Sequence, residues 1–141
     1  MTTHVAPQAK DWYQAKETDS GYEKVIGYLP AAHGLTLAQN DTVQMVKVPI
    51  GAVVADLVLL MGDIGNSVTP NVGDLISATR YISAGTVSTG CHLAWSTTQS
   101  GVPYTYTAAD TIDVVLAGAN PADNVAIALI VGYLCGVDIT P

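Results

Sequence analysis

Apolar and polar residues alternate with a period of two in short segments of this chain, and turn residues separate the segments. The alternation is clearest over residues 86–95 and 111–117, where successive residues belong to opposite faces. Side chains of a β-strand point alternately to its two sides, so this pattern predicts half-buried strands. Eight strands are predicted, over residues 24–29, 42–48, 53–61, 72–76, 86–95, 104–107, 111–117 and 125–135.

The residue types also favour an all-β fold. No glutamate follows Glu23, and Lys47 is the only lysine after Lys24, although these two residue types normally fill the exposed faces of helices. β-Branched Val, Ile and Thr are abundant and suit a pleated sheet, while 13 glycines and 7 prolines supply turns. We therefore predict a jelly roll or a related antiparallel β-sandwich.

A polar lead precedes the first predicted strand. We predict that residues 1–22 form an extended N-terminal arm and that residues 23–141 form the β-sandwich domain. The lead carries Trp12, Tyr13 and Tyr22. Aromatic side chains give a large contact area at low entropic cost, so these three are predicted to bind the surface of a partner. The alternative is a short helix over residues 7–18 that packs on its own domain.

The last predicted strand, residues 125–135, has no polar face. Large aliphatic or aromatic residues alternate with small or aliphatic ones along its whole length. Exposed apolar patches usually mark interfaces, so the strand predicts a homo-oligomer. The residues expected to make the contact between copies are Ile127, Leu129, Ile130, Val131 and Leu134. The alternative is that loops or the N-terminal lead cover this face.

The charge balance argues against two classes of partner. Five basic residues stand against 12 acidic ones, for a net charge of −7. Nucleic acids and anionic membranes both need clustered Lys and Arg, and only Lys47 and Arg80 occur from Val25 onward. The apolar runs are too short for a bilayer, and no secretory signal is visible. We expect a soluble chain made inside the cell, without nucleic-acid or membrane partners.

The sequence lacks the usual motifs for catalysis and cofactor binding. Residues 62–66 have the glycines of a phosphate-binding loop but not its Lys and Ser/Thr, and Gly-x-Ser-x-Gly is absent. Cys91 and His92 are adjacent in a predicted strand, so they leave opposite faces and cannot serve one metal or one reaction. Cys91 and Cys135 could form a disulfide, but the missing secretory signal favours two buried thiols. We expect no enzyme, no cofactor and no metal site.

Four carboxylates near predicted turns remain as candidates for chemistry: Asp63, Asp74, Asp110 and Asp113. Each is predicted to cap a turn, because Asp side chains accept hydrogen bonds from nearby backbone N–H groups. The Asp-Thr pairs at 41–42 and 110–111 each begin a strand and are expected to act in this way. A weak calcium site between Asp63 and Asp74 is the alternative, although no Glu follows to close such a loop.

Two stretches of the chain resemble small structural proteins of tailed bacteriophages. Residues 72–85 contain a Gly-Asp at 73–74, an Arg-Tyr-Ile at 80–82 and an Ala-Gly at 84–85, and residues 104–115 lead on to the apolar stretch 126–133. In these features the chain resembles capsid decoration proteins, also called cement or head-stabilising proteins. One departure is Ala109, where a second acidic residue is expected before Asp110; this weakens the case for a metal-binding pair.

The resemblance implies a β-sandwich that assembles outside a phage head, often as a trimer, and clamps neighbouring capsid subunits. We therefore expect a structural virion protein on the capsid exterior, made in the host cytoplasm, whose partners are the major capsid protein and further copies of itself. The alternative is a head-fibre or tail adhesion module that recognises host surface glycans through Trp95, Tyr104 and Tyr106. A small hydrolase with an unfamiliar site is a third hypothesis.

Overall fold

The computed structural model describes residues 1–6, 21–65, 67–85, 92–95 and 103–135, with side chains in all of these ranges except 92–95. The described ranges contain nine strands: β1 (Thr3–Val5), β2 (Gly21–Leu29), β3 (Thr42–Val48), β4 (Val53–Met61), β5 (Thr69–Gly73), β6 (His92–Trp95), β7 (Tyr104–Thr105), β8 (Asp110–Ala117) and β9 (Ile127–Cys135). They hold no helix that is long and apolar enough to cross a membrane.

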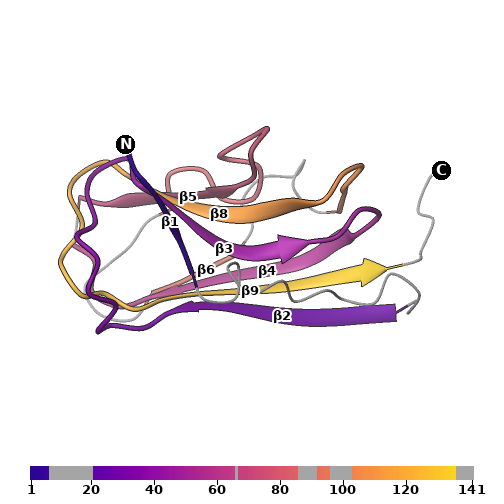
Figure 1. Ribbon diagram of the computed structural model, residues 1–141, viewed down its shortest axis with the longest axis horizontal. Coiled ribbons are helices and arrows are strands. Elements are labelled where there is room, and N and C mark those ends of the chain that lie inside the picture. The colour runs from indigo at the N-terminus through magenta and orange to yellow at the C-terminus, as the bar shows by residue number, and fades with distance from the viewer. Residues whose placement is uncertain (7–20, 66, 86–91, 96–102, 136–141) are drawn as a thin grey trace.

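The strands form two sheets that lie one above the other (Figure 1). The four-stranded sheet has the order β1-β3-β8-β5, and the five-stranded sheet has the order β2-β9-β4-β6, with β7 also pairing with β4. All pairs of strands are antiparallel except β1 and β3, which run parallel. The predicted fold class is thus confirmed, and the chain is an all-β, jelly-roll-like sandwich.

Most predicted strands lie where the alternation placed them. The observed β3 and β4 coincide with the predicted segments 42–48 and 53–61. The strand predicted over 72–76 is instead β5, which ends at Gly73, because the next residue turns the chain. The carboxylate of that residue, Asp74, accepts the backbone N–H groups of Ile76 and Ser77. Of the strand predicted over 86–95, residues 86–91 lie outside the described ranges.

The core consists of the side chains that point between the two sheets. In the five-stranded sheet β9 lies between β2 and β4, and Ile127, Leu129 and Val131 are fully buried in the core. These three predicted self-association residues therefore hold the sandwich together. The other two, Ile130 and Leu134, are half-buried on the outward side of the sheet.

The first residues of the chain belong to the four-stranded sheet. Parallel pairing sets β1 beside β3, and the buried Asp41 carboxylate accepts the N–H of Thr2 at 2.8 Å and that of Ala38 at 2.9 Å. His4 Nε2 lies 3.0 Å from the same carboxylate. Burial alone raises the pKa of Asp41, but these hydrogen bonds outweigh it and lower the pKa. Two parts of the predicted arm, residues 3–5 and 21–22, therefore belong to β1 and β2 of the sandwich. Trp12 and Tyr13 lie outside the described residues, so their part of the arm stays a prediction.

Candidate functional site

The outward side of the five-stranded sheet carries an apolar surface, which we call the outer apolar face: Ile26, Tyr28, Leu60, Ala128 and Ile130. The register pairs Ile26 with Ile130 across β2 and β9, and it places Ala128 between Tyr28 and Leu60. Ile26 is 52% exposed and Tyr28 is 44% exposed. Contiguous exposed apolar side chains of this kind are typical of a surface that contacts another protein.

A polar row borders the outer apolar face. The register aligns Lys24, Gly132 and Asp56 across β2, β9 and β4. The ring of Tyr22 lies over Gly132, where a Cβ atom would collide with it, and its hydroxyl donates to Asp56 Oδ2 at 3.4 Å. Tyr22, predicted as part of the arm, is thus the second residue of β2 and is 51% exposed. The register of β2 and β9 places Leu134 opposite Tyr22.

On the other layer, residues 74–85, which follow β5, form a loop that rises from the four-stranded sheet on the side away from β2 (Figure 1). Its first residue, Asp74, is buried, and its carboxylate accepts the backbone N–H of Ile76 at 3.1 Å and that of Ser77 at 2.8 Å. Arg80 closes the loop with a forked ion pair, in which Nε and Nη2 donate to the two oxygens of Asp74. The loop from Asp74 to Arg80 is therefore tied at both ends.

Three tyrosines brace this ion pair. The Tyr106 hydroxyl donates to Asp74 Oδ2 at 3.2 Å and lies 2.8 Å from the Tyr81 hydroxyl. The Arg80 guanidinium lies 3.7 Å from the centre of the Tyr104 ring, an attractive cation–π contact. Burial raises the pKa of Tyr81 and of Tyr106, so both phenols stay neutral. Although burial opposes it, the Asp74 carboxylate raises the pKa of Arg80, which keeps its charge.

The ion pair and its contacts engage two of the aromatic side chains that the adhesion hypothesis assigned to glycan stacking. Tyr106 is only 3% exposed and belongs to the core, and the guanidinium of Arg80 lies over the ring of Tyr104. A sugar needs an open aromatic face for stacking. The third residue of that hypothesis, Trp95, lies in β6, for which the structure describes the backbone alone. Nothing at Tyr104 or Tyr106 therefore favours glycan binding.

The same ion pair and tyrosines explain why the residues of the motif at 72–85 occur at their positions. A Cβ atom at Gly73 would collide with the carbonyl oxygen of Ser77, so only glycine fits below the loop. Asp74 and Arg80 form the ion pair, and Tyr81 extends it into the core. At Gly85 a Cβ atom would lie 3.2 Å from the carbonyl oxygen of Pro70, tighter than ordinary contact. The motif thus specifies the frame of a loop.

The predicted turn caps have mixed outcomes. Asp41 and Asp74 accept turn N–H groups as expected, and Asp110 Oδ1 accepts the N–H of Thr111 at 2.7 Å. The prediction is wrong for Asp113, which lies within β8, is 9% exposed and has no hydrogen-bond partner at Oδ1 among the described residues. Burial raises the pKa of Asp113 to about 7, and the nearby charges of Asp110 and Asp74 act in the same direction.

The calcium alternative between Asp63 and Asp74 gains no support. Asp63 is exposed, while both oxygens of Asp74 are bound by Arg80 and backbone N–H groups. In the ranges that the structure describes, no three His, Cys, Asp or Glu side chains come together as a possible metal site. Of the two cysteines, Cys135 is buried, which raises the pKa of its thiol, and Cys91 lies outside the described residues.

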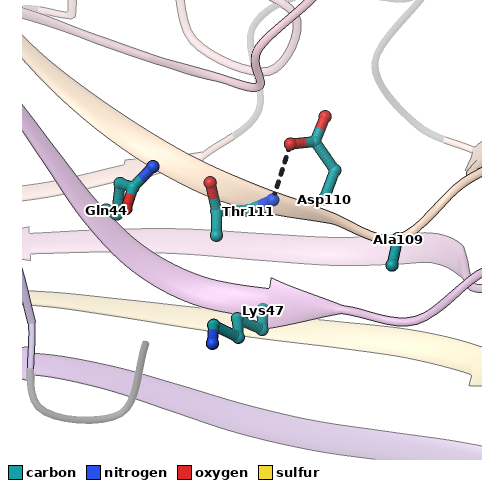
Figure 2. A pocket seen from close by; sticks show the side chains of 5 residues that line it. All are labelled: Gln44, Lys47, Ala109, Asp110 and Thr111. Atoms are coloured by element: carbon teal, nitrogen blue, oxygen red, sulfur yellow. Dashed lines mark hydrogen bonds between the residues drawn. The ribbon is translucent and has the colours of Figure 1, made fainter. Parts of the chain in front are cut away.

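A shallow hollow lies where β3 and β8 run side by side, lined by Gln44, Lys47, Ala109, Asp110 and Thr111. Figure 2 shows the Asp110 carboxylate turned back to the N–H of Thr111, with the Lys47 side chain directed away from it. Ala109 contributes no second carboxylate. The charged groups do not converge on one point, so the hollow has no arrangement suited to catalysis or ion binding.

Comparison with known proteins gives likenesses in fold. No protein-family model matches the chain, and no curated protein matches it. A chain in the capsid of Ralstonia phage GP4 has a TM-score of 0.75 at 18% identity, covering 96% of this chain and 99% of that one. A chain in the cyanophage Pam1 capsid asymmetric unit has a TM-score of 0.66 at 23% identity, with coverages of 91% and 94%.

A third likeness is to a chain in the acidic stable capsid structure of Helicobacter pylori bacteriophage KHP30. Its TM-score is 0.58 at 18% identity, with coverages of 84% of this chain and 90% of that one. All three match nearly the whole of both chains, so the comparison concerns the complete sandwich. This protein has the fold of chains that occur in phage capsid structures.

Proposed function

We propose that this chain is a structural virion protein that binds the outside of a phage head and stabilises the capsid by bridging neighbouring major capsid subunits. The observation that carries the proposal is the likeness to a chain of the Ralstonia phage GP4 capsid over 96% of this chain and 99% of that one. Because both chains are covered almost completely, the likeness concerns the whole sandwich and not one part of it.

The surfaces of the molecule suit binding better than catalysis. The buried Asp41 and Asp74 are engaged by backbone N–H groups and by His4 or Arg80, which leaves them a structural role. The outer apolar face offers an area that another protein could cover. A protein that binds only the assembled shell shifts the equilibrium towards the shell, and contacts with several subunits multiply a modest affinity.

The proposal includes self-association, as a trimer, through the outer apolar face. Ile130 lies in this face, and Leu134 lies farther along the same side of β9. Ile26 adds an exposed aliphatic side chain directly beside Ile130. The predicted arm, with Trp12 and Tyr13, would then reach from the trimer to the capsid surface.

The decisive experiment adds the purified protein to empty shells assembled from the major capsid protein encoded in the same genome. We expect the protein to sediment with the shells up to a fixed stoichiometry and to raise the temperature at which they disassemble. The matched comparison is a Trp12→Ala/Tyr13→Ala variant, which should bind more weakly if the arm contacts the shell. Absence of binding by the unaltered protein would refute the proposed function.

Self-association is tested by the mass of the protein in solution, measured by light scattering behind a sizing column. We expect a trimer for the unaltered chain and a monomer for an Ile26→Ser/Ile130→Ser variant, because both substitutions make the outer apolar face polar. An Ile50→Ser variant is the control, since Ile50 is 56% exposed in the turn between β3 and β4. A monomer in all three cases would contradict the trimer.

A further inference from the structure

The loop that follows β5 carries two exposed aliphatic residues directly after Asp74, Leu75 and Ile76, which we call the aliphatic tip. Leu75 is 85% exposed and Ile76 is 79% exposed, more than any other large apolar side chain of the described residues except Met1. Exposure of two adjacent aliphatic side chains is unfavourable in water. Such a pair is more favourable when another surface covers it.

The aliphatic tip is held in a fixed shape. Besides the carboxylate bonds to Ile76 and Ser77, the N–H groups of Asp74 and Arg80 both donate to the carbonyl oxygen of Ser77, at 3.0 and 3.2 Å. Below the loop, a Cβ atom at Gly73 would collide with that same oxygen. A preorganised loop has little conformational entropy to lose on binding, so more of the contact energy appears as affinity.

We infer that the aliphatic tip is an anchor that inserts into an apolar pocket on the major capsid protein, an inference that rests on the proposed function. The neighbours of the tip suit such a contact. The exposed Ala78 and Thr79 and the half-buried Ser77 are small and uncharged, and they can pack against the rim of a pocket. A few anchor residues that become buried inside a ring of weakly contributing, water-excluding residues carry most of the binding energy of an interface.

The position of the tip favours the capsid over a second copy as its partner. The tip belongs to the loop that rises from the four-stranded sheet, while the outer apolar face belongs to the five-stranded sheet on the opposite layer (Figure 1). Copies associated through the outer apolar face would leave the tip free to meet a different protein. An anionic membrane is disfavoured because the chain carries a net charge of −7, and Arg80, the cation nearest in sequence, is paired with Asp74.

The test is a Leu75→Ser/Ile76→Ser variant assayed for binding to the same empty shells. Both positions are exposed, so the fold should keep its unfolding midpoint and its mass in solution. We expect binding about a hundredfold weaker than that of the unaltered protein, as expected for the loss of two anchor residues. The Ile50→Ser variant, which removes an exposed aliphatic side chain elsewhere, should bind within about threefold of the unaltered protein.

The outcomes separate this inference from the function on which it rests. If the unaltered protein and the double variant bind equally well, the inference is wrong and the proposed function stands. If the double variant changes the mass of the protein in solution, the tip contacts a second copy, and the capsid pocket is excluded. If the unaltered protein does not bind shells, the proposed function and the inference both fail.

Discussion

Asp74 and Asp113 are buried carboxylates in neighbouring parts of the four-stranded sheet, and their surroundings are opposite. Asp74 is 4% exposed and Asp113 is 9% exposed. The register of β5 and β8 pairs Asp113 with Gly73, the residue before Asp74. Both oxygens of Asp74 are hydrogen-bonded, with Arg80 supplying the compensating charge. At Asp113, Oδ1 has no hydrogen-bond partner in the part of the chain that the structure describes.

The difference shows that burial alone does not define what a carboxylate does. At Asp74 a fixed cation and several N–H groups replace the lost water, and the carboxylate becomes the frame of the loop that carries the aliphatic tip. At Asp113 the Thr111 side chain supplies a hydrogen bond, but no cation of the described residues takes this place, so burial raises the pKa to about 7. Asp113 is therefore expected to bind a proton near neutral pH, whereas Asp74 has a structural role.

The largest effect on stability is expected from removing the charge of Asp74. An Asp74→Asn variant leaves the partly buried Arg80 without its countercharge, and we expect a loss of about 3 kcal/mol in the free energy of unfolding. Urea unfolding followed by tyrosine and tryptophan fluorescence measures it. Hydrogen exchange at the N–H groups of Ile76 and Ser77 should also become faster, because their acceptor is weaker.

The control for this prediction is Asp63→Asn, which removes an exposed carboxylate at the other end of the segment 63–74. Its effect should stay within about 0.5 kcal/mol, as is usual for surface substitutions. Similar losses in the two variants would mean that Arg80 does not depend on Asp74, and the frame of the loop would need another explanation.

The sequence predicted the parts of the fold that depend on local patterns. Alternation located β3 and β4 at their observed bounds, and the Asp-Thr pair at 41–42 indicated the cap that Asp41 makes. Alternation also separated the two faces of β9, but it did not distinguish the face that packs in the core from the one that faces outward. That choice depends on which side the second sheet covers.

The loop frame was beyond local patterns because its members come from distant segments. Asp74 and Arg80 meet within one loop, but Tyr106 reaches them from a segment 32 residues after Asp74. The sequence signal for this loop was the resemblance of its Gly-Asp and Arg-Tyr-Ile to phage structural proteins, and the sequence alone did not explain why these residues occur together. Asp113 was predicted to cap a turn, because alternation could not reveal that its side of β8 is buried.

The raised pKa of Asp113 predicts that the stability of the fold depends on pH. Its pKa is about 7 in the folded chain, above the value of about 3.9 for an unfolded Asp. The folded state therefore holds the proton more tightly, and this contribution to stability is lost as the pH rises through about 7. An Asp113→Asn variant carries no charge to desolvate at any pH.

We expect Asp113→Asn to match the unaltered protein in unfolding free energy at about pH 4 and to exceed it by about 1–3 kcal/mol at about pH 8.5. Urea unfolding at both pH values measures the difference. Asp63→Asn is the control, and it should show no such gain at high pH because Asp63 is exposed and its charge is not among those that raise the pKa of Asp113. Asp74→Asn should lose stability at both pH values, since Arg80 remains charged throughout. An equal pH dependence in the Asp113 variant and the unaltered protein would mean that folding does not raise the pKa of Asp113, and the contrast with Asp74 would disappear.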